Sequence, residues 1–122
     1  MSVFTRTVEV EAQGTAGAAS GSSRLGVGPA KLLGVKLVYN TAAPSTTDIT
    51  IVSGGRTLFT RSNSKVDAWF QPRENAHKTD TTAIPAGDNP WEPQLVHEYL
   101  EVQVNQCDPL TIAVRATLFF EA

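Results

Sequence analysis

The residues best able to do chemistry are two histidines, each beside carboxylates. Glu74 precedes His77 and Asp80 follows it, a trio that could in principle bind a metal ion. Zinc sites take three or four strong ligands at tight spacing, whereas this trio offers one histidine in an irregular stretch. His97 and Glu98 stand where a strand is expected to begin, and a polar pair at a strand edge is the simpler interpretation. We therefore predict neither a metal nor a cofactor.

Other catalytic and ligand-binding patterns are also missing from the sequence. Serines are plentiful, but none stands in a G-x-S-x-G elbow. Gly54-Gly55 lacks the spaced glycines and the Lys-Ser/Thr pair of a phosphate-binding loop. Asp80, Asp88 and Asn89 supply oxygen ligands without the D-x-D-x-D-G spacing of a calcium loop. The expectation is a protein that is not an enzyme.

Composition limits the possible partners. The formal net charge is −2 and no basic run exists, so we expect no nucleic-acid partner. The N-terminal stretch MSVFTRTVEV does not read as a signal peptide, and no apolar run reaches the roughly 18 residues of a membrane span. We therefore expect no membrane partner. The single cysteine, Cys107, lies in a predicted turn and excludes an internal disulfide or a multi-cysteine metal site.

Alternating apolar and polar residues predict about seven strands. Phe4–Ala12 alternates with period two, as a half-buried strand does. The segment 32–39 is apolar on both faces, which is typical of a central strand. Gly54-Gly55 predicts a tight hairpin between 46–52 and 57–61. A further short strand is expected at 66–70, and a last hairpin joins 100–104 to 110–120 across Asn105–Pro109. The residues expected to face inward are Val8, Val10, Ala12, Leu33, Val35, Leu37, Tyr39, Ile49, Ile51, Leu110, Ile112, Val114, Ala116, Leu118 and Phe120.

Two segments lack this periodicity. Residues 13–28 are rich in Gly, Ala, Ser and Thr, so that residues 1–30 comprise an N-terminal strand and an arm. Either this arm holds an edge strand around Ser20–Arg24 or it becomes ordered on a partner, and both remain open. Residues 71–94 contain four prolines and predict one long Pro-rich loop. Within it, Trp91 either closes the end of the core or anchors a partner.

Together these patterns predict an all-β fold. The strands, the many turn residues and the absence of a helical period indicate a compact antiparallel β-sandwich or barrel. A chain of 122 residues suits one domain, residues 1–122.

Two aromatic residues, a proline and an arginine near the centre of the chain form a distinctive group. Trp69, Phe70 and Pro72 are followed by Arg73, whose guanidinium could stack on one of the rings as a structural latch. Alternatively, Arg73 pairs with an acidic group on a neighbouring protein. Phe119 is expected to point away from the core, toward another subunit or a covering loop. The candidate partner contacts are Trp91, Arg73, Phe119 and Arg24.

Part of the chain resembles a known family. The residues that carry the resemblance are Val38-Tyr39, Thr46-Thr47-Asp48-Ile49-Thr50-Ile51, Thr57-Leu58, Trp69-Phe70, Pro72-Arg73 and His77. This pattern resembles the small head proteins of tailed bacteriophages that coat the capsid as decoration, or cement, proteins. The likeness runs from Leu32 to the C-terminus, and its most specific part is the aromatic-aromatic-x-Pro-Arg turn after Asp67. Ala68 stands where the family often has glycine.

The resemblance implies a structural role. It implies a jelly-roll or tulip-like β-domain without enzymatic activity, which is made in the host cytoplasm and then binds the major capsid protein on the exterior of the virion. It also implies a homo-oligomer, with a trimer favoured because a trimer matches the local three-fold points of an icosahedral shell. The arm near Ser20 could reach a neighbour by strand addition.

Two other functions are compatible with the sequence. One is a glycan-recognition module on the virion surface, for which Trp91 with Asp88 and Asn89 is the candidate patch. The other is a head-completion or tail subunit, which would occur in far fewer copies per particle than a cement protein.

Overall fold

The structure is a computed structural model, and it describes residues 2–75, 91–96 and 99–122. In these residues the chain forms ten strands and no helix, so no helix is long and apolar enough to cross a membrane. The strands are β1 (Val3–Ala12), β2 (Ala19–Gly26), β3 (Ala30–Tyr39), β4 (Asp48–Ser53), β5 (Arg56–Arg61), β6 (Ala68–Phe70), β7 (Arg73–Asn75), β8 (Trp91–Val96), β9 (Tyr99–Cys107) and β10 (Leu110–Glu121).

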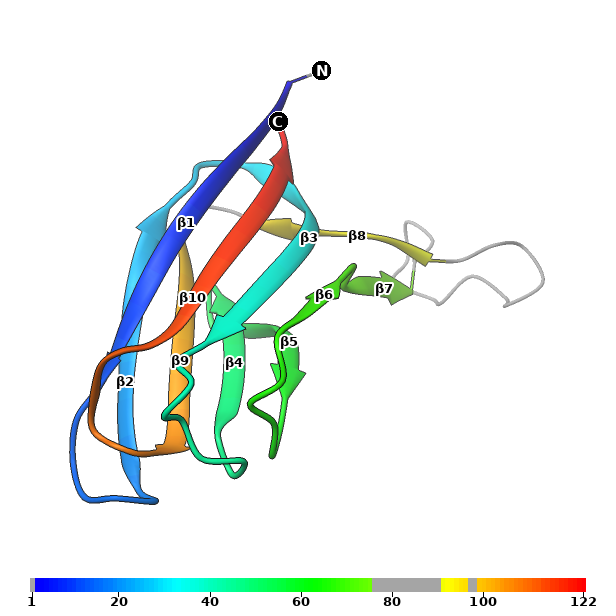
Figure 1. Ribbon diagram of the computed structural model, residues 1–122. Helices are drawn as coiled ribbons and strands as arrows, with labels where there is room; N and C mark the ends of the chain where they lie inside the picture. Colours follow the sequence, from blue (N-terminus) through cyan, green and yellow to red (C-terminus); the bar gives the residue numbers. More distant parts are fainter. Residues whose placement is uncertain (1, 76–90, 97–98) are drawn as a thin grey trace.

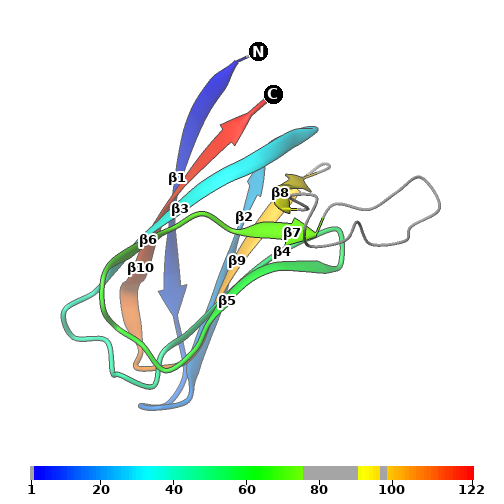
Figure 2. The same ribbon diagram turned by 90° about the vertical axis from the view of Figure 1, so that its right-hand side faces the viewer.

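The strands form two antiparallel sheets that pack face to face (Figures 1 and 2). The larger sheet has the order β1-β10-β3-β8-β7, and β6 also pairs with β3. The smaller sheet has the order β2-β9-β4-β5. The predicted all-β class is therefore confirmed as a sandwich. The two ends of the described chain lie side by side, where the Ala122 amide donates to the Ser2 carbonyl at 2.8 Å.

The core is made by the inward faces of both sheets. Because side chains alternate along a strand, every second residue of β3, β4, β9 and β10 turns to the same interior. Burying each large side chain stabilises the fold by about 1.5–3 kcal/mol. The largest fully buried side chains are Phe120, Leu32, Leu37, Ile49, Ile51, Leu100, Leu118, Val10, Val35, Val96, Val102 and Val104.

Several sequence predictions are confirmed. β1 has the expected half-buried alternation, and β3 occupies the centre of its sheet. Ile49 and Ile51 are fully buried. β4 and β5 form the predicted hairpin, whose turn residues Gly54 (φ 57°) and Gly55 (φ 79°) both adopt the left-handed conformation that such turns require.

The predicted hairpin between the last two long strands is wrong. β9 pairs with β2 and β4, whereas β10 pairs with β1 and β3, so the connection passes from one sheet to the other. Both strands have an apolar inner face, and packing across the sandwich buries those faces as well as hairpin pairing would. Ile112, expected inside, lies near this connection and is 36% exposed.

Cys107, expected in a turn, is instead the buried last residue of β9.

The predicted face of β3 is wrong at its beginning. Phe119 pairs with Gly34 but Phe120 pairs with Leu32, so Leu33 is an extra residue in β3. This bulge reverses the alternation and turns Leu32 into the core, where it is fully buried, while Leu33 is only partly buried.

The arm at 13–28 contains β2, which is the first of the two alternatives, an edge strand. β2 also lies close against β1 in the other sheet: the Ser23 hydroxyl donates to the Glu9 carbonyl at 2.9 Å. Gly21 approaches the Glu11 carbonyl so closely that an added Cβ would lie 1.7 Å from its oxygen. The sandwich is therefore closed along this side by backbone contact.

The predicted long Pro-rich loop at 71–94 contains regular structure at both ends. β7 and β8 pair with each other, and β8 also pairs with β3 through Val96 and Ala30. Pro93 lies within β8, in a two-stranded ribbon that extends sideways from the body (Figure 1). Proline is tolerated there because the ribbon is not the centre of a sheet. Residues 76–90 lie outside the described residues.

The close approach of β2 to β1 leads to a stability prediction. We expect Gly21→Ala to lower the free energy of unfolding by at least about 2 kcal/mol, because the new methyl group must displace the backbone of β1. Gly26→Ala in the same strand is the control, since nothing lies within 4 Å of its added Cβ, and its effect should stay within about 0.5 kcal/mol. Urea denaturation of both variants checks this. Equal effects would contradict the contact.

Candidate contact surface on the larger sheet

Trp69 is the most unusual exposed residue of the larger sheet. It lies in β6 opposite Lys36 of β3, and half of its side chain is exposed. Its neighbour Phe70 pairs with the buried Val35 and turns inward, so the indole must point out of the sheet. A large apolar ring is thus presented to solvent from a strand whose other aromatic residue packs against the core.

Phe119 and Gly34 hold the indole in place. The ring centroids of Trp69 and Phe119 are 4.6 Å apart with an interplanar angle of 73°, an edge-to-face contact. Such a pair contributes about 0.5–1.5 kcal/mol beyond simple burial. Gly34 pairs with Phe119 and lies under the indole, where an added Cβ would be 3.2 Å from Trp69 Cζ2. The ring therefore lies against bare backbone in one defined position.

Arg73 and Pro72 secure the end of β6. The Arg73 Nη1 donates to the Leu33 carbonyl at 3.0 Å and to the Pro72 carbonyl at 2.9 Å. The sequence led us to expect Arg73 over an aromatic ring, but the guanidinium over Phe70 is that of Arg61, 4.8 Å from the ring centroid. Arg73 thus joins the segment after β6 to the backbone of β3.

Other apolar side chains extend this surface. Leu95 of β8 is 41% exposed, and it pairs with Lys31 on the outer side because both of its neighbours in β8 are buried. Val3 of β1 is 62% exposed on the same side. A shallow depression of about 300 Å³ is lined by Leu95 of β8, Lys31 of β3 and Glu121 of β10. We call the group Trp69, Phe119, Leu95, Val3 and the adjoining Lys36 the aromatic surface.

Arg24 lies in the other layer and is not part of the aromatic surface. Its Nε is 3.2 Å from Glu101 Oε2, and its guanidinium lies 4.5 Å from the centroid of the Tyr99 ring. The side chain of Gln103 also donates to Glu101, and this bond, followed by the one from Arg24, holds the pKa of the Glu101 carboxyl below its usual value. Arg24 therefore has partners within its own chain.

The remaining candidate residues lie outside the described part of the chain or at its edge. Asp80, Asp88, Asn89 and the two histidines lie outside the described residues, and of Trp91 only its backbone position at the start of β8 is described. Within residues 2–75, 91–96 and 99–122, no group of three or more His, Cys, Asp or Glu side chains could hold a metal ion. On the larger sheet, the aromatic surface is the candidate contact site.

Sequence reasoning identified Trp69 and Phe119 separately but not as a pair. Their contact depends on β6 joining β3 next to β10, which no short-range pattern reveals. The available signal was the adjacent pair Trp69-Phe70, because two neighbouring residues in a strand must point to opposite faces. One of the two rings had to be outside.

Comparison with known proteins does not assign the chain to a family. No model of a known protein family matches the chain, and no curated protein shows significant similarity to it. The function is therefore inferred from the residues and the fold.

Two aromatic truncations distinguish a surface anchor from a core residue. We expect Trp69→Ala to lower the free energy of unfolding by about 1–2 kcal/mol, since half of the ring is already exposed. Phe120→Ala removes a fully buried ring and should cost about 3–5 kcal/mol. Chemical denaturation measures both. An equal loss would show that Trp69 serves mainly to hold the fold together.

Proposed function

We propose that this protein is a decoration, or cement, protein that binds the major capsid protein of a tailed bacteriophage and stabilises the head. The resemblance from Leu32 to the C-terminus suggests this role. In this role the protein has no enzymatic activity, lies on the exterior of the virion and acts only by contact with its neighbours.

The observation that carries the proposal is the presentation of Trp69. Tryptophan is enriched among the residues that dominate the energy of protein interfaces. Its ring is fixed by Phe119 and Gly34, so little conformational freedom remains to be lost when a partner covers it. A half-exposed ring, held rigid on an open sheet face, is suited to binding a protein surface.

The aromatic surface also has the right shape for a lattice partner. Leu95 and Val3 lie on the same outer face with Lys31 and Glu121 between them, and Lys36 lies beside the indole. Contact with a broad, folded surface suits this open sheet face, with its shallow depression, better than enclosure of a small molecule. Each copy needs only modest affinity, because many copies held together on one shell raise the effective concentration of each.

Self-association would strengthen this binding further. A homotrimer would place three aromatic surfaces around a local three-fold point of the capsid. The proposal therefore includes an oligomer, with three copies favoured over two or one by the symmetry of the shell.

A capsid-binding experiment tests the proposal. Phage heads stripped of the protein are mixed with purified wild-type chain or with Trp69→Ala, and bound protein is quantified after sedimentation. We expect wild-type protein to rebind in hundreds of copies per head. The variant should bind at least about 30-fold more weakly, as is usual for loss of a dominant interface residue. Val66→Ala, a residue 65% exposed but outside the aromatic surface, should bind normally.

Three results would contradict the proposal or its details. Absence of the protein from purified virions would exclude the role altogether. A copy number of about a dozen would indicate a head-completion or tail subunit instead. Normal binding by Trp69→Ala would exclude the aromatic surface as the docking face while leaving the role intact.

A further inference from the structure

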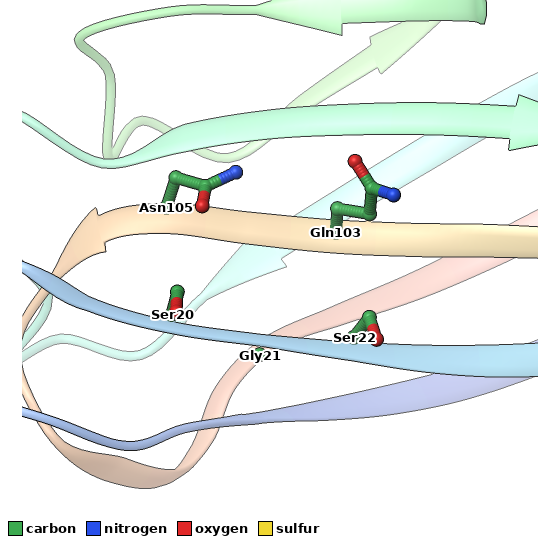
Figure 3. Close-up of a pocket in the computed structure, with 5 residues that line it drawn as sticks. All are labelled: Ser20, Gly21, Ser22, Gln103 and Asn105. Atoms are coloured by element: carbon green, nitrogen blue, oxygen red, sulfur yellow. The ribbon is translucent and has the colours of Figure 1, made fainter.

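A row of neutral polar side chains crosses the outer face of the smaller sheet. Val102 and Val104 of β9 are fully buried, so the alternating residues Gln103 and Asn105 point outward. Ser20 and Ser22 of the neighbouring β2 point the same way, and Figure 3 shows all four side chains on one side of the two strands. With Gly21 between them, they line a shallow depression of about 320 Å³.

The row continues into the next strands. Thr50 of β4 pairs with Gln103 on one side and with Thr60 of β5 on the other, so both threonines share the outer face. We call Ser20, Ser22, Gln103, Asn105, Thr50 and Thr60 the polar track. Its six members offer uncharged hydroxyl and amide groups that can each donate and accept hydrogen bonds. The carboxylate of Asp48 lies beside them, opposite Asn105, and its Oδ1 accepts a hydrogen bond from the Asn63 amide at 2.9 Å.

The charged residues at one end of the polar track neutralise one another. Arg24 pairs with Glu101, and Glu101 also accepts a hydrogen bond of 2.6 Å from Gln103 Nε2. This bond fixes which way the Gln103 amide faces. A ligand lying on the track therefore meets oriented dipoles and a neutral ion pair, which favours an uncharged partner over an anion or a cation.

The aromatic ring of Tyr99 lies at the same end of the polar track as Arg24 and Glu101. Tyr99 lies two residues before Glu101 on the outer face of β9, and its partner in β2 is Gly26. The guanidinium of Arg24 stacks on the ring and holds it in place. Hydroxyl and amide groups beside an aromatic ring are the combination that recognises sugar rings, whose hydroxyls both donate and accept while their C–H faces pack on aromatic surfaces.

The two outer faces differ in chemistry and point in opposite directions. The larger sheet presents Trp69 with Lys31 and Lys36, whereas the polar track is neutral and hydrophilic. Figure 2 shows the two sheets as separate layers, so a contact made by one face leaves the other uncovered. If the aromatic surface lies on a capsid, the polar track faces the surroundings of the particle.

We propose that the polar track binds a neutral oligosaccharide chain, with Ser22, Gln103 and Asn105 as its central hydrogen-bonding groups. Oligosaccharide binding by the isolated protein does not depend on the proposed capsid role. Only the statement that the polar track faces away from the particle rests on that role. The site is distinct from the patch around Trp91.

Affinity electrophoresis and a glycan array test this inference. Wild-type protein is run in native gels that contain dextran, galactomannan or mixed-linkage β-glucan, and is applied to an array of neutral bacterial and plant oligosaccharides. We expect retardation or array binding with at least one neutral glycan. Gln103→Ala/Asn105→Ala should weaken that binding about tenfold or more, because two hydrogen-bonding groups are lost.

Two control variants test whether a loss of glycan binding is specific to the polar track. Thr5→Ala/Thr7→Ala removes two exposed polar side chains from the larger sheet and should leave glycan binding unchanged. Trp69→Ala should also leave it unchanged, so that failure of capsid binding and failure of glycan binding are distinguishable. Circular dichroism establishes that each variant is folded.

Three outcomes would overturn the inference. The first is that no neutral glycan binds to the wild-type protein. The second is that the Gln103/Asn105 variant and the Thr5/Thr7 variant lose binding equally. The third is a preference for an anionic polymer such as alginate, which would mean that charge rather than the neutral track governs the contact.

Discussion

One extra residue in β3 determines much of the architecture of the larger sheet. Leu33 bulges between two pairs of the ladder with β10, so the strand reverses its alternation at that point. Leu32 enters the core, and Gly34 is left on the outer face opposite Phe119. Because glycine occupies that position, the indole of Trp69 can lie on the backbone itself. The bulge therefore sets the core packing at the start of β3, and the glycine that follows it gives the indole its place on the outer face.

The sequence was sufficient to predict the elements whose signal is local. Period-two alternation located β1 and β4, and two consecutive glycines located the turn between β4 and β5. What it could not predict was the identity of strand partners. β9 and β10 alternate so regularly that a hairpin looked natural, yet alternation defines only which face is buried and not which strand lies alongside.

The errors at the candidate sites have the same physical origin. Arg73 stands beside Trp69 and Phe70 in sequence, but the cation that reaches Phe70 is Arg61 from another sheet. Likewise, Ser22 and Gln103 are 81 positions apart, and their shared depression exists only because β2 pairs with β9. The prolines in 71–94 indicated a loop, so β7 and β8 were not predicted. A short two-stranded ribbon can contain a proline such as Pro93, whereas a central strand cannot. Non-local pairing creates surfaces that residue order does not reveal.

The hydrogen bond between Ala122 and Ser2 has a practical consequence for anyone using this scaffold. Both ends of the described chain leave the body at the same pole, away from the centres of the two sheet faces. A reporter or cargo domain joined at either end would emerge from that pole, beside Val3 at one edge of the aromatic surface, and would leave the polar track accessible. The same geometry would allow a short linker to join the two ends, so that new ends could be opened at another turn and cargo could be directed to a different side.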